Sequence, residues 1–391
     1  MKKLLVLSGS HSDIPLIEAG KQLGFHVITT GNDSTLIGHR YADEYHSVDF
    51  SDKQAILDLS RQLNIDAICS CANDFGAITA SYVAEQMGLP GHDPYETALT
   101  LHHKHRFKEF ALANKISTPY AASFLSPEDA CKGLDTLRFP LIVKPVDLTG
   151  GKGVSKVDSQ EEYIKAVHYA YSCSRMNQFL VEEFIQGTYH SFSTFVLDRK
   201  MVFCYSDNEY SFVNPYLVTT SAAPAIGIDI VKYQLKAEAE RIIDLLSLSD
   251  GIFHIQYIQT GAKAWIMEVT RRCSGDFYPY PVNYATGLDW AKWIVKAESG
   301  FDCGDFPHVV QRGFFGRHCI MSRRNGVIKR IGINHELEGN IIDKFIVLTN
   351  GDLIDDYMVN KLGVIILQYG SMEEMILKTT NMNTLVSVEL E

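Results

Sequence analysis

The sequence predicts an α/β protein that begins with a parallel β-sheet and ends in a β-rich segment. Over the first third, apolar runs of strand length alternate with segments that have helical spacing. From about residue 304, short apolar runs are separated by turn residues. Hydrophobic residues make up 46% of the chain and charged residues 21%, which is enough for a large core. At roughly 100–200 residues per domain, 391 residues predict two to three domains.

The first third predicts three strands, each followed by a helix. We expect strands at residues 3–8, 25–30 and 66–71, and helices at residues 14–24, 53–63 and 78–87. Such a pattern forms a parallel sheet with right-handed crossovers. Ligands of these sheets bind at the carboxyl ends of the strands. The polar residues at those ends are Ser10, His11, Asp33, Asn73 and Asp74, and the first four are our substrate-binding candidates.

The middle of the chain predicts further alternating elements. We expect helices at 102–114, 160–171 and 237–248, and strands at 139–143, 179–184, 192–197, 201–205, 251–259 and 264–269. The last two strands flank Thr260-Gly261, a hairpin signal. The aromatic stretch 278–284 predicts a turn-rich loop that either selects substrate or simply packs. Boundaries near 94–101 and 297–307 divide the chain into domains 1–96, 97–303 and 304–391.

Charge and composition exclude several classes of protein. Acidic residues exceed Lys and Arg by 47 to 36, with no basic run, so we expect no nucleic-acid partner. No apolar run reaches the roughly 18–20 residues of a spanning helix, so we expect no membrane partner. Eight dispersed cysteines do not form a disulfide scaffold. We therefore expect a reduced, cytoplasmic protein. The turn after the first strand lacks G-x-G-x-x-G, which argues against a nicotinamide-dependent oxidoreductase.

A lysine and a glycine-rich turn suggest a phosphate site. Lys144 ends an apolar run, and Thr149, Gly150, Gly151 and Gly153 follow it closely. Glycines permit positive φ, so successive backbone N–H groups can surround a phosphate. A flexible hairpin beside a surface lysine explains the same pattern equally well. The Walker sequence is absent.

Two further groups of polar residues lie in predicted strands. Glu182 and Glu183 interrupt the apolar run 179–185, so they belong either to an edge strand or to a hinge between two lobes. Gln256 and Glu268 lie on the two strands of the predicted hairpin. Their oxygens are suited to a hard cation such as Mg²⁺, although exposed polar residues would produce the same pattern. Arg272, just beyond, is suited to bind a carboxylate or an acyl phosphate.

Taken in order, these segments resemble the ATP-grasp superfamily over nearly the whole chain. The first part resembles the preATP-grasp domain of biotin carboxylase and of the carboxylase of purine synthesis. The segments that carry the resemblance are NDFGAITASYVAEQMGLPG (73–91), HHKHRFKEFALANKISTPY (102–120), FPLIVKPVDLTGGKGV (139–154), FLVEEFIQG (179–187) and IMEVTRRCSGD (266–276). The resemblance implies a two-lobed ATP-grasp domain between a parallel-sheet domain and a small β-rich domain.

The resemblance also implies a role for each matching residue. Lys104 and Lys144 would contact the phosphates of ATP, and Thr149, Gly150, Gly151 and Gly153 would form the lid. Glu182, Glu183, Phe184 and Ile185 would border the adenine, with Glu183 and Ile185 using backbone groups in part. Glu268 and Gln256 would hold Mg²⁺ or Mn²⁺, and Arg272 the substrate. The chain departs from the family pattern at three positions: Tyr189 at the ribose position, Gln256 in place of an acid, and Thr270 in place of Asn.

The implied activity is that of a carboxylate–amine ligase with ATP as cofactor. It would convert a small carboxylic acid into an acyl phosphate and join it to an amine, releasing ADP and phosphate. The alternatives are a bicarbonate-dependent carboxylase and an ATP-binding regulatory protein that has lost catalysis. The partners are then small molecules, with a homodimer as the expected assembly. His254, next to Gln256 in the strand pattern, is either a general base or a core histidine.

Overall fold

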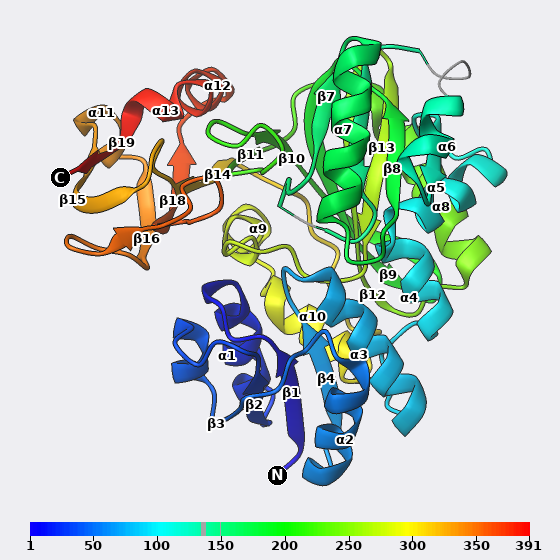
Figure 1. The fold of residues 1–391 in the computed structure, drawn as a ribbon. Helices are drawn as coiled ribbons and strands as arrows, with labels where there is room; N and C mark the ends of the chain where they lie inside the picture. Colours follow the sequence, from blue (N-terminus) through cyan, green and yellow to red (C-terminus); the bar gives the residue numbers. More distant parts are fainter. Residues whose placement is uncertain (134–137, 149) are drawn as a thin grey trace.

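The computed structural model describes residues 1–133, 138–148 and 150–391 (Figure 1). Its first sheet has the order β3-β2-β1-β4, with all neighbours parallel. The strands are β1 (Lys3–Leu7), β2 (His26–Thr30), β3 (Glu44–His46) and β4 (Ala67–Ser70), and the helices are α1 (Ile14–Gln22), α2 (Lys53–Leu63) and α3 (Asp74–Met87). Two short 3₁₀ helices, η1 (His11–Asp13) and η2 (Ile37–Tyr41), accompany them. The predicted parallel sheet is confirmed.

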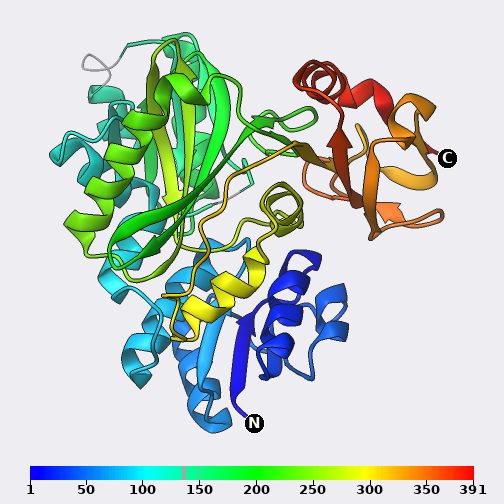
Figure 2. The same cartoon turned by 180° about the vertical axis from the view of Figure 1, so that it is seen from behind.

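Both faces of β1 are covered, which explains its continuous apolar run. Leu4 and Val6 pack with Trp290 and neighbouring residues, whereas Leu5 and Leu7 pack with side chains of α2 and α3. Successive residues of a strand point to opposite faces, so such a strand needs apolar residues at every position. Trp290 begins α10 (Trp290–Glu298), which contacts α1 although about 270 residues separate them (Figure 2). The chain therefore returns to its first sheet after crossing the middle lobes.

The expected loop at 278–284 is wrong, because α9 (Pro279–Thr286) occupies this stretch. Pro279 and Pro281 lie in the first turn of the helix, where the backbone N–H groups need no partner within the helix. Tyr278, just before the helix, is fully buried. Prolines and aromatic residues therefore resemble a turn in sequence but here begin a helix.

A small antiparallel sheet, β5-β8-β6-β7, carries the glycine-rich turn. Its strands are β5 (Ala121–Phe124), β6 (Leu141–Pro145), β7 (Ser155–Val157) and β8 (Phe179–Glu183), with α6 (Pro127–Lys132) and α7 (Gln160–Cys173) packed against it. The strand with the two glutamates, β8, lies between β5 and β6. The edge-strand interpretation of Glu182 and Glu183 is therefore wrong.

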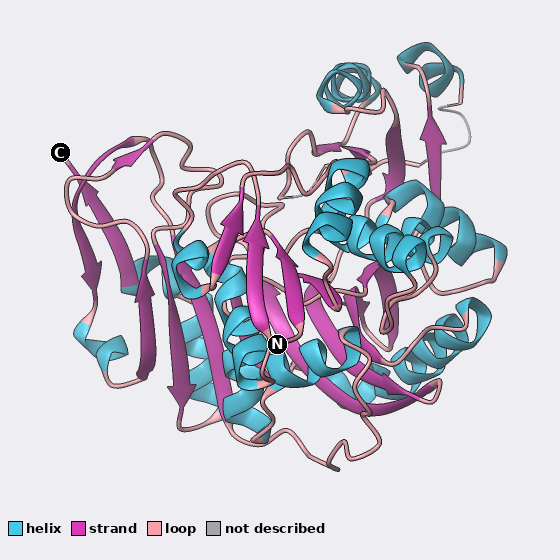
Figure 3. Cartoon of the chain, turned by 90° about the horizontal axis from the view of Figure 1, so that it is seen from below, coloured by secondary structure: helices cyan, strands magenta, loops and turns pink. Residues whose placement is uncertain are grey.

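The large antiparallel sheet has the order β13-β12-β9-β10-β11-β14-β18-β16 (Figure 3). Its strands are β9 (Thr188–Leu197), β10 (Lys200–Tyr210), β11 (Thr220–Ala223), β12 (Gly251–Thr260), β13 (Lys263–Thr270), β14 (Phe314–Ile320), β16 (Ile341–Ile346) and β18 (Gly363–Tyr369). The predicted hairpin is β12–β13. Since β14, β18 and β16 extend this sheet, the β-rich end of the chain continues the middle of the molecule. The division at residues 96 and 303 stays a prediction.

The remaining elements complete the two ends of the large sheet. A three-stranded sheet, β17 (Leu353–Ile354), β15 (Gly326–Ile333) and β19 (Val386–Leu390), lies at the carboxyl end with α11 (His335–Glu338), α12 (Met372–Thr380) and α13 (Met382–Leu385). Near the other end, α8 (Ile228–Leu246) and α5 (Lys104–Ala113) share a core with β9, β12 and β13. None of the helices in the described ranges is long and apolar enough to cross a lipid bilayer.

Two predicted helices have different limits in the structure. The expected helix 102–114 is α5, and α4 (Tyr95–His102) precedes it where a domain boundary was expected. The expected helix 237–248 begins nine residues earlier, at Ile228. Exposed Ile230 and Tyr233 disturb the amphipathic pattern in that first part.

Candidate functional site

Gln256 and Glu268 lie directly opposite each other on β12 and β13. Directly opposed residues of an antiparallel pair point to the same face, so the two side chains are neighbours, as the hairpin predicted. Gln256 Nε2 donates to both carboxylate oxygens of Glu209, at 3.0 and 2.8 Å. Its Oε1 therefore remains the available ligand atom, and Glu268 is exposed to solvent. These two oxygen donors suit Mg²⁺, which takes phosphate and water oxygens as its other ligands.

Lys104, Glu268 and Arg272 line one pocket. They come from three places in the chain, the start of α5, the end of β13 and the loop after β13. Thr270 and Asp74 line the same pocket. Two positive groups and a carboxylate thus face a common space, as transfer of an anionic phosphoryl group with a metal ion requires.

Asp74, at the start of α3, holds Arg272. Arg272 Nε donates to Asp74 Oδ1 at 3.1 Å, and His102 Nδ1 approaches the same oxygen at 3.0 Å. Burial alone would raise the pKa of Asp74, but Arg272 and His102 outweigh burial and hold that pKa well below its ordinary value. The first sheet therefore orients the arginine that enters the pocket.

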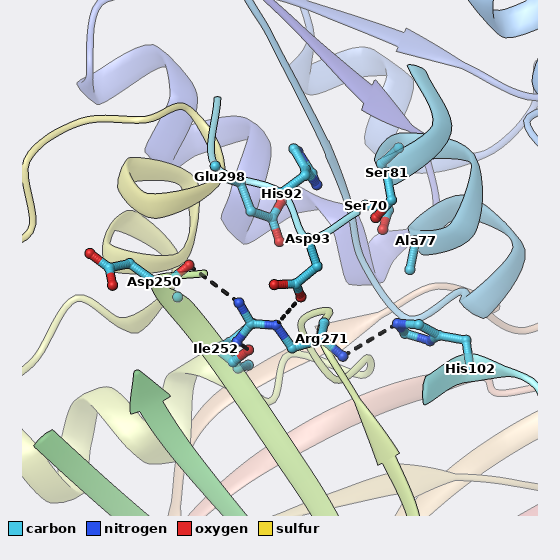
Figure 4. A pocket seen from close by; sticks show the side chains of 13 residues that line it. Ser70, Ala77, Ser81, His92, Asp93, His102, Asp250, Ile252, Arg271 and Glu298 are labelled. Carbon is cyan, nitrogen blue, oxygen red and sulfur yellow. Dashed lines mark hydrogen bonds and ion pairs between the residues drawn. The ribbon is translucent and has the colours of Figure 1, made fainter. Parts of the chain in front are cut away.

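The preceding arginine, Arg271, is bonded to neighbouring protein groups and has a structural role (Figure 4). Its Nε donates to Asp93 at 2.7 Å, and its guanidinium also donates to the carbonyls of Ser249 and Ile252. These partners take up most of the N–H donors of the guanidinium. The two adjacent arginines thus have different roles. Arg271 connects the first part of the chain to β12, and Arg272 faces the pocket.

Lys144 is paired with Glu182, and a second lysine joins them. Lys144 Nζ lies 3.1 Å from Glu182 Oε1, and Lys108 Nζ lies 2.7 Å from Oε2. Glu182 is fully buried. Burial would raise the pKa of Glu182, but Lys108 and Lys144 lower it overall, while burial lowers the pKa of Lys108 to about 8. The carboxylate therefore engages lysines, and its predicted contact with adenine stays a prediction.

The glycine-rich turn joins β6 to β7. Gly150, Gly151 and Gly153 all have positive φ, at 69°, 76° and 72°. A Cβ on Gly151 or Gly153 would also approach Tyr216 or Pro145 within 3 Å, so only glycine fits there. Lys104 Nζ donates to the carbonyl of Leu148 at 2.8 Å, which connects the turn to the pocket. Thr149 lies outside the described residues.

The predicted adenine hinge follows β8, and part of its backbone is already used. The amide of Glu183 donates to Tyr120 O, and that of Phe184 donates to Pro140 O. The predicted roles of Glu183 and Phe184 at the adenine stay predictions. Ile185 is partly buried, and its predicted role stays a prediction. Tyr189, at the ribose position on β9, is 48% exposed.

The substrate candidates at the first sheet have local roles. Ser10 and Asp13 form a capping box, with Ser10 Oγ donating to Asp13 at 2.6 Å. Asn73 caps α3 by accepting from Gly76 N, and exposed Asp33 accepts from Thr35 N. His11 reaches further and pairs with Asp276 at 3.2 Å. None of the four candidates lines the pocket with Glu268; Asp74 does.

Two of the residues that the sequence left undecided now have a clear place. His254 is buried, its Nδ1 lies 2.6 Å from Ser193 Oγ, and burial lowers its pKa to about 3. It is a core histidine. Three further residues, Lys108, Asp207 and Glu209, were not predicted from the sequence. A signal existed for Lys108, because it follows Lys104 by four residues on one helix face.

Comparisons with known proteins agree with this geometry. The family model for the phosphoribosylglycinamide synthetase ATP-grasp (A) domain matches residues 102–213. A formate-dependent phosphoribosylglycinamide formyltransferase of Burkholderia thailandensis is 26% identical over 286 residues, covering 69% of each chain. A D-alanine–D-alanine ligase of Xylella fastidiosa is 28% identical over 239 residues, covering 58% of this chain and 72% of that protein.

Solved structures share the fold over the whole chain. An L-amino acid ligase from Bacillus licheniformis has a TM-score of 0.83 at 18% identity, covering 100% of this chain and 99% of that one. An N5-carboxyaminoimidazole ribonucleotide synthetase from Thermotoga maritima has a TM-score of 0.76 at 17% identity, with complete coverage of both chains. At these identities the likeness establishes the architecture, and residue roles must come from the site itself.

Proposed function

Because this chain belongs to the ATP-grasp superfamily, we propose that it is an ATP-dependent ligase that joins a small carboxylic acid to an amine. The observation that carries the proposal is the shared pocket of Lys104, Glu268 and Arg272. ATP would supply the γ-phosphoryl group that turns the carboxylate into an acyl phosphate, and Mg²⁺ would neutralise the charge of the phosphate oxygens. The amine then forms the C–N bond, and phosphate leaves with ADP already formed.

The residues of the chain provide position and charge in this reaction. Lys104 and Lys144 neutralise phosphate oxygens, and Glu268 with Gln256 Oε1 holds the cation. Arg272, oriented by Asp74, binds the carboxylate and then the oxyanion that develops as the amine attacks. The glycine-rich turn at 150–153 closes over the phosphates and keeps water from the acyl phosphate. The predicted homodimer and cytoplasmic location stay predictions.

A hydroxamate assay tests the proposal. Purified protein receives ATP, Mg²⁺, hydroxylamine and one candidate acid at a time, and an acyl phosphate is trapped as the hydroxamate. We expect ATP-dependent hydroxamate with at least one acid, and a loss of about 10²-fold or more in Lys144→Ala and Glu268→Ala. Lys232→Ala and Glu128→Ala, at exposed positions, serve as matched controls. Full turnover in Glu268→Ala would contradict the proposed metal site.

The carboxylase alternative predicts a different dependence in the same assay. Some solved neighbours are described as biotin carboxylase or N5-carboxyaminoimidazole ribonucleotide synthetase. ATP hydrolysis that requires bicarbonate, and that no organic acid replaces, would favour the carboxylase. ATP binding without phosphate release for any acid or amine would favour the regulatory protein.

A further inference from the structure

A row of polar residues crosses the large sheet from the proposed metal position to β14. Glu268 faces Gln256, Gln256 faces Ser191 on β9, and Ser191 faces Asp207 on β10. Two residues further along β10, Glu209 faces Ser221 on β11, which faces Arg317 on β14. Directly opposed residues and residues two apart in a strand share one face. We call these seven residues the polar row; it lies on the face of the sheet that carries Glu268.

The centre of the polar row contains two buried carboxylates without a cation. Asp207 is fully buried and Glu209 is 8% exposed. Within the described residues, no lysine, arginine or histidine forms an ion pair with either. Ser191 Oγ donates to Asp207 Oδ1, whereas Asp207 Oδ2 has no hydrogen-bond partner there. A buried carboxylate oxygen without a donor is costly, and native structures rarely tolerate one without a reason.

The nearest cation, Arg317, is already engaged. It lies 3.3 Å from Asp276 Oδ2 and donates to Ser221 Oγ and to the carbonyl of Gly275. Lys361 is also paired with Asp276, at 2.5 Å. Arg317 and Lys361 thus form their ion pairs with Asp276. Arg317 still attracts Asp207 and Glu209, but neither carboxylate has an ion pair of its own in the described part of the chain.

Glu209 lies one side chain away from the proposed metal position. Its two oxygens accept from Gln256 Nε2, and Gln256 faces Glu268. A group bound by Asp207 and Glu209 would therefore lie on the same face as the cation proposed at Glu268. Arg272, which we assign to the substrate carboxylate, lines the same pocket as Glu268, so a carboxylate bound there would lie near the row.

From this arrangement we propose that the acid activated by this enzyme carries a cationic amino group, and that Asp207 and Glu209 bind that group. The inference rests on the proposed function. An ammonium group has three N–H donors and one positive charge, which match the free Asp207 Oδ2 and the remaining acceptor positions of Glu209. A second metal ion fits less well, because the described residues contain no group of three or more metal-binding side chains. The substrate class is that of amino acids, including those with a distant amino group.

The test compares amino acids with the matching acids that lack the amino group. The probes are the L-amino acids, β-alanine and γ-aminobutyrate, each with its des-amino acid, in the hydroxamate assay. We expect the amino form to have a kcat/KM at least 10-fold above that of its des-amino partner. Asp207→Asn and Glu209→Gln should each raise the KM for the amino acid at least 10-fold. The KM for ATP in Asp207→Asn should stay within twofold, and exposed Asp229→Asn is the control.

A binding measurement keeps the inference testable if no acid yields hydroxamate. Calorimetric titration of the same amino acids into protein with Mg²⁺ and a non-hydrolysable ATP analogue should show binding to the wild type and at least 10-fold weaker binding to Asp207→Asn. Both amide variants should unfold at the wild-type temperature or above it, because burial raises the pKa of both acids and an amide removes the cost of ionising them. Misfolding would then not explain the loss.

The outcomes separate the two proposals. Absence of hydroxamate from every acid contradicts the proposed function, whereas hydroxamate with unchanged amino-acid KM in both variants contradicts the amino-group site alone. Wild-type protein that binds no amino acid also overturns the inference. So does the loss of one bound Mn²⁺ in Asp207→Asn, measured by electron paramagnetic resonance, because the pair would then hold a metal. Equal kcat/KM for amino and des-amino acids would show that Asp207 and Glu209 do not bind the amino group. The two carboxylates would then share a proton instead.

Discussion

Two positions in the molecule hold buried carboxylates with opposite charge balance. Near the glycine-rich turn, the single carboxylate of Glu182 faces two lysines, Lys108 and Lys144. In the middle of the large sheet, the two carboxylates of Asp207 and Glu209 face no lysine or arginine in an ion pair among the described residues. A buried charge needs a partner of opposite charge, so the imbalance at each position indicates the charge of the ligand that would bind there. The lysine-rich position suits phosphate, and the acidic position suits a cation.

The largest effect should come from Glu182→Gln. This change leaves Lys108 and Lys144 without their carboxylate, and breaking a buried pair typically costs about 3–5 kcal/mol of folding free energy. Urea unfolding measures the loss, with Glu183→Gln as the neighbouring control. A loss under about 1 kcal/mol would mean that Glu182 does not hold the lysines.

The same pair predicts a pH dependence of stability. The pKa of Glu182 is lowered in the folded protein, so its stabilisation is complete above pH 4.5, the ordinary value, and is lost as the pH falls below it. Glu182→Gln should therefore be less sensitive to acid than the wild type over that range. Lys108 acts in the same direction at high pH, so that stability again rises with pH. Because its folded pKa is lowered to about 8, stability gains from its deprotonation between about pH 8 and 10.5.

Glu298 offers a smaller test of what an unpaired carboxylate costs. It lies outside the proposed cleft on α10, one of its oxygens has no partner among the described residues, and burial raises its pKa to about 8. The folded protein then holds a proton that the unfolded chain releases above pH 4.5, so stability falls as the pH rises from 4.5 to 8. Glu298→Gln should be more stable than the wild type at pH 8 by on the order of 2 kcal/mol.

Thermal unfolding at pH 5 and pH 8 measures this difference. The wild type should lose stability between the two values, and the Gln variant should lose less. An equal loss in both proteins would show that Glu298 is ionised at no cost. The cost that we assign to Asp207 and Glu209 would then need revision as well.

The smallest effect should come from Asp74→Asn. The amide still accepts a hydrogen bond from Arg272 but lacks the charge that fixes the guanidinium. We expect kcat to fall about 10-fold with the KM for ATP unchanged, which corresponds to about 1.4 kcal/mol. Steady-state kinetics measures the split, and the change should have little further effect in an Arg272→Lys background. A raised KM for ATP instead would place Asp74 at the nucleotide.

The sequence predicts local pairings well because they depend on spacing within one or two elements. Gln256 and Glu268 come together because they lie on the two strands of one hairpin, and Lys144 lies near the glycines in the chain because they follow it in the turn between β6 and β7. The parallel sheet follows from the alternation of strands and helices. These features require no knowledge of distant contacts.

Other parts of the site depend on contacts that spacing does not reveal. Lys108 meets Glu182 through packing of α5 on β8, 74 positions later in the chain. The strand expected at 201–205 ends before Asp207, because Ser-Asp-Asn-Glu is too polar for a strand by pattern alone, yet β10 continues to Tyr210. A buried strand with acids contradicts the usual alternation, and such exceptions are expected at functional positions.

The central claim is that one cleft holds a nucleotide at the two lysines and a cation at Glu268. A crystal structure with Mg²⁺ and a non-hydrolysable ATP analogue tests it most directly. We predict phosphate oxygens within hydrogen-bond distance of Lys104 and Lys144, and Mg²⁺ bound to Glu268 and Gln256 Oε1. A nucleotide bound elsewhere, or a metal ion that contacts neither side chain, would contradict the account.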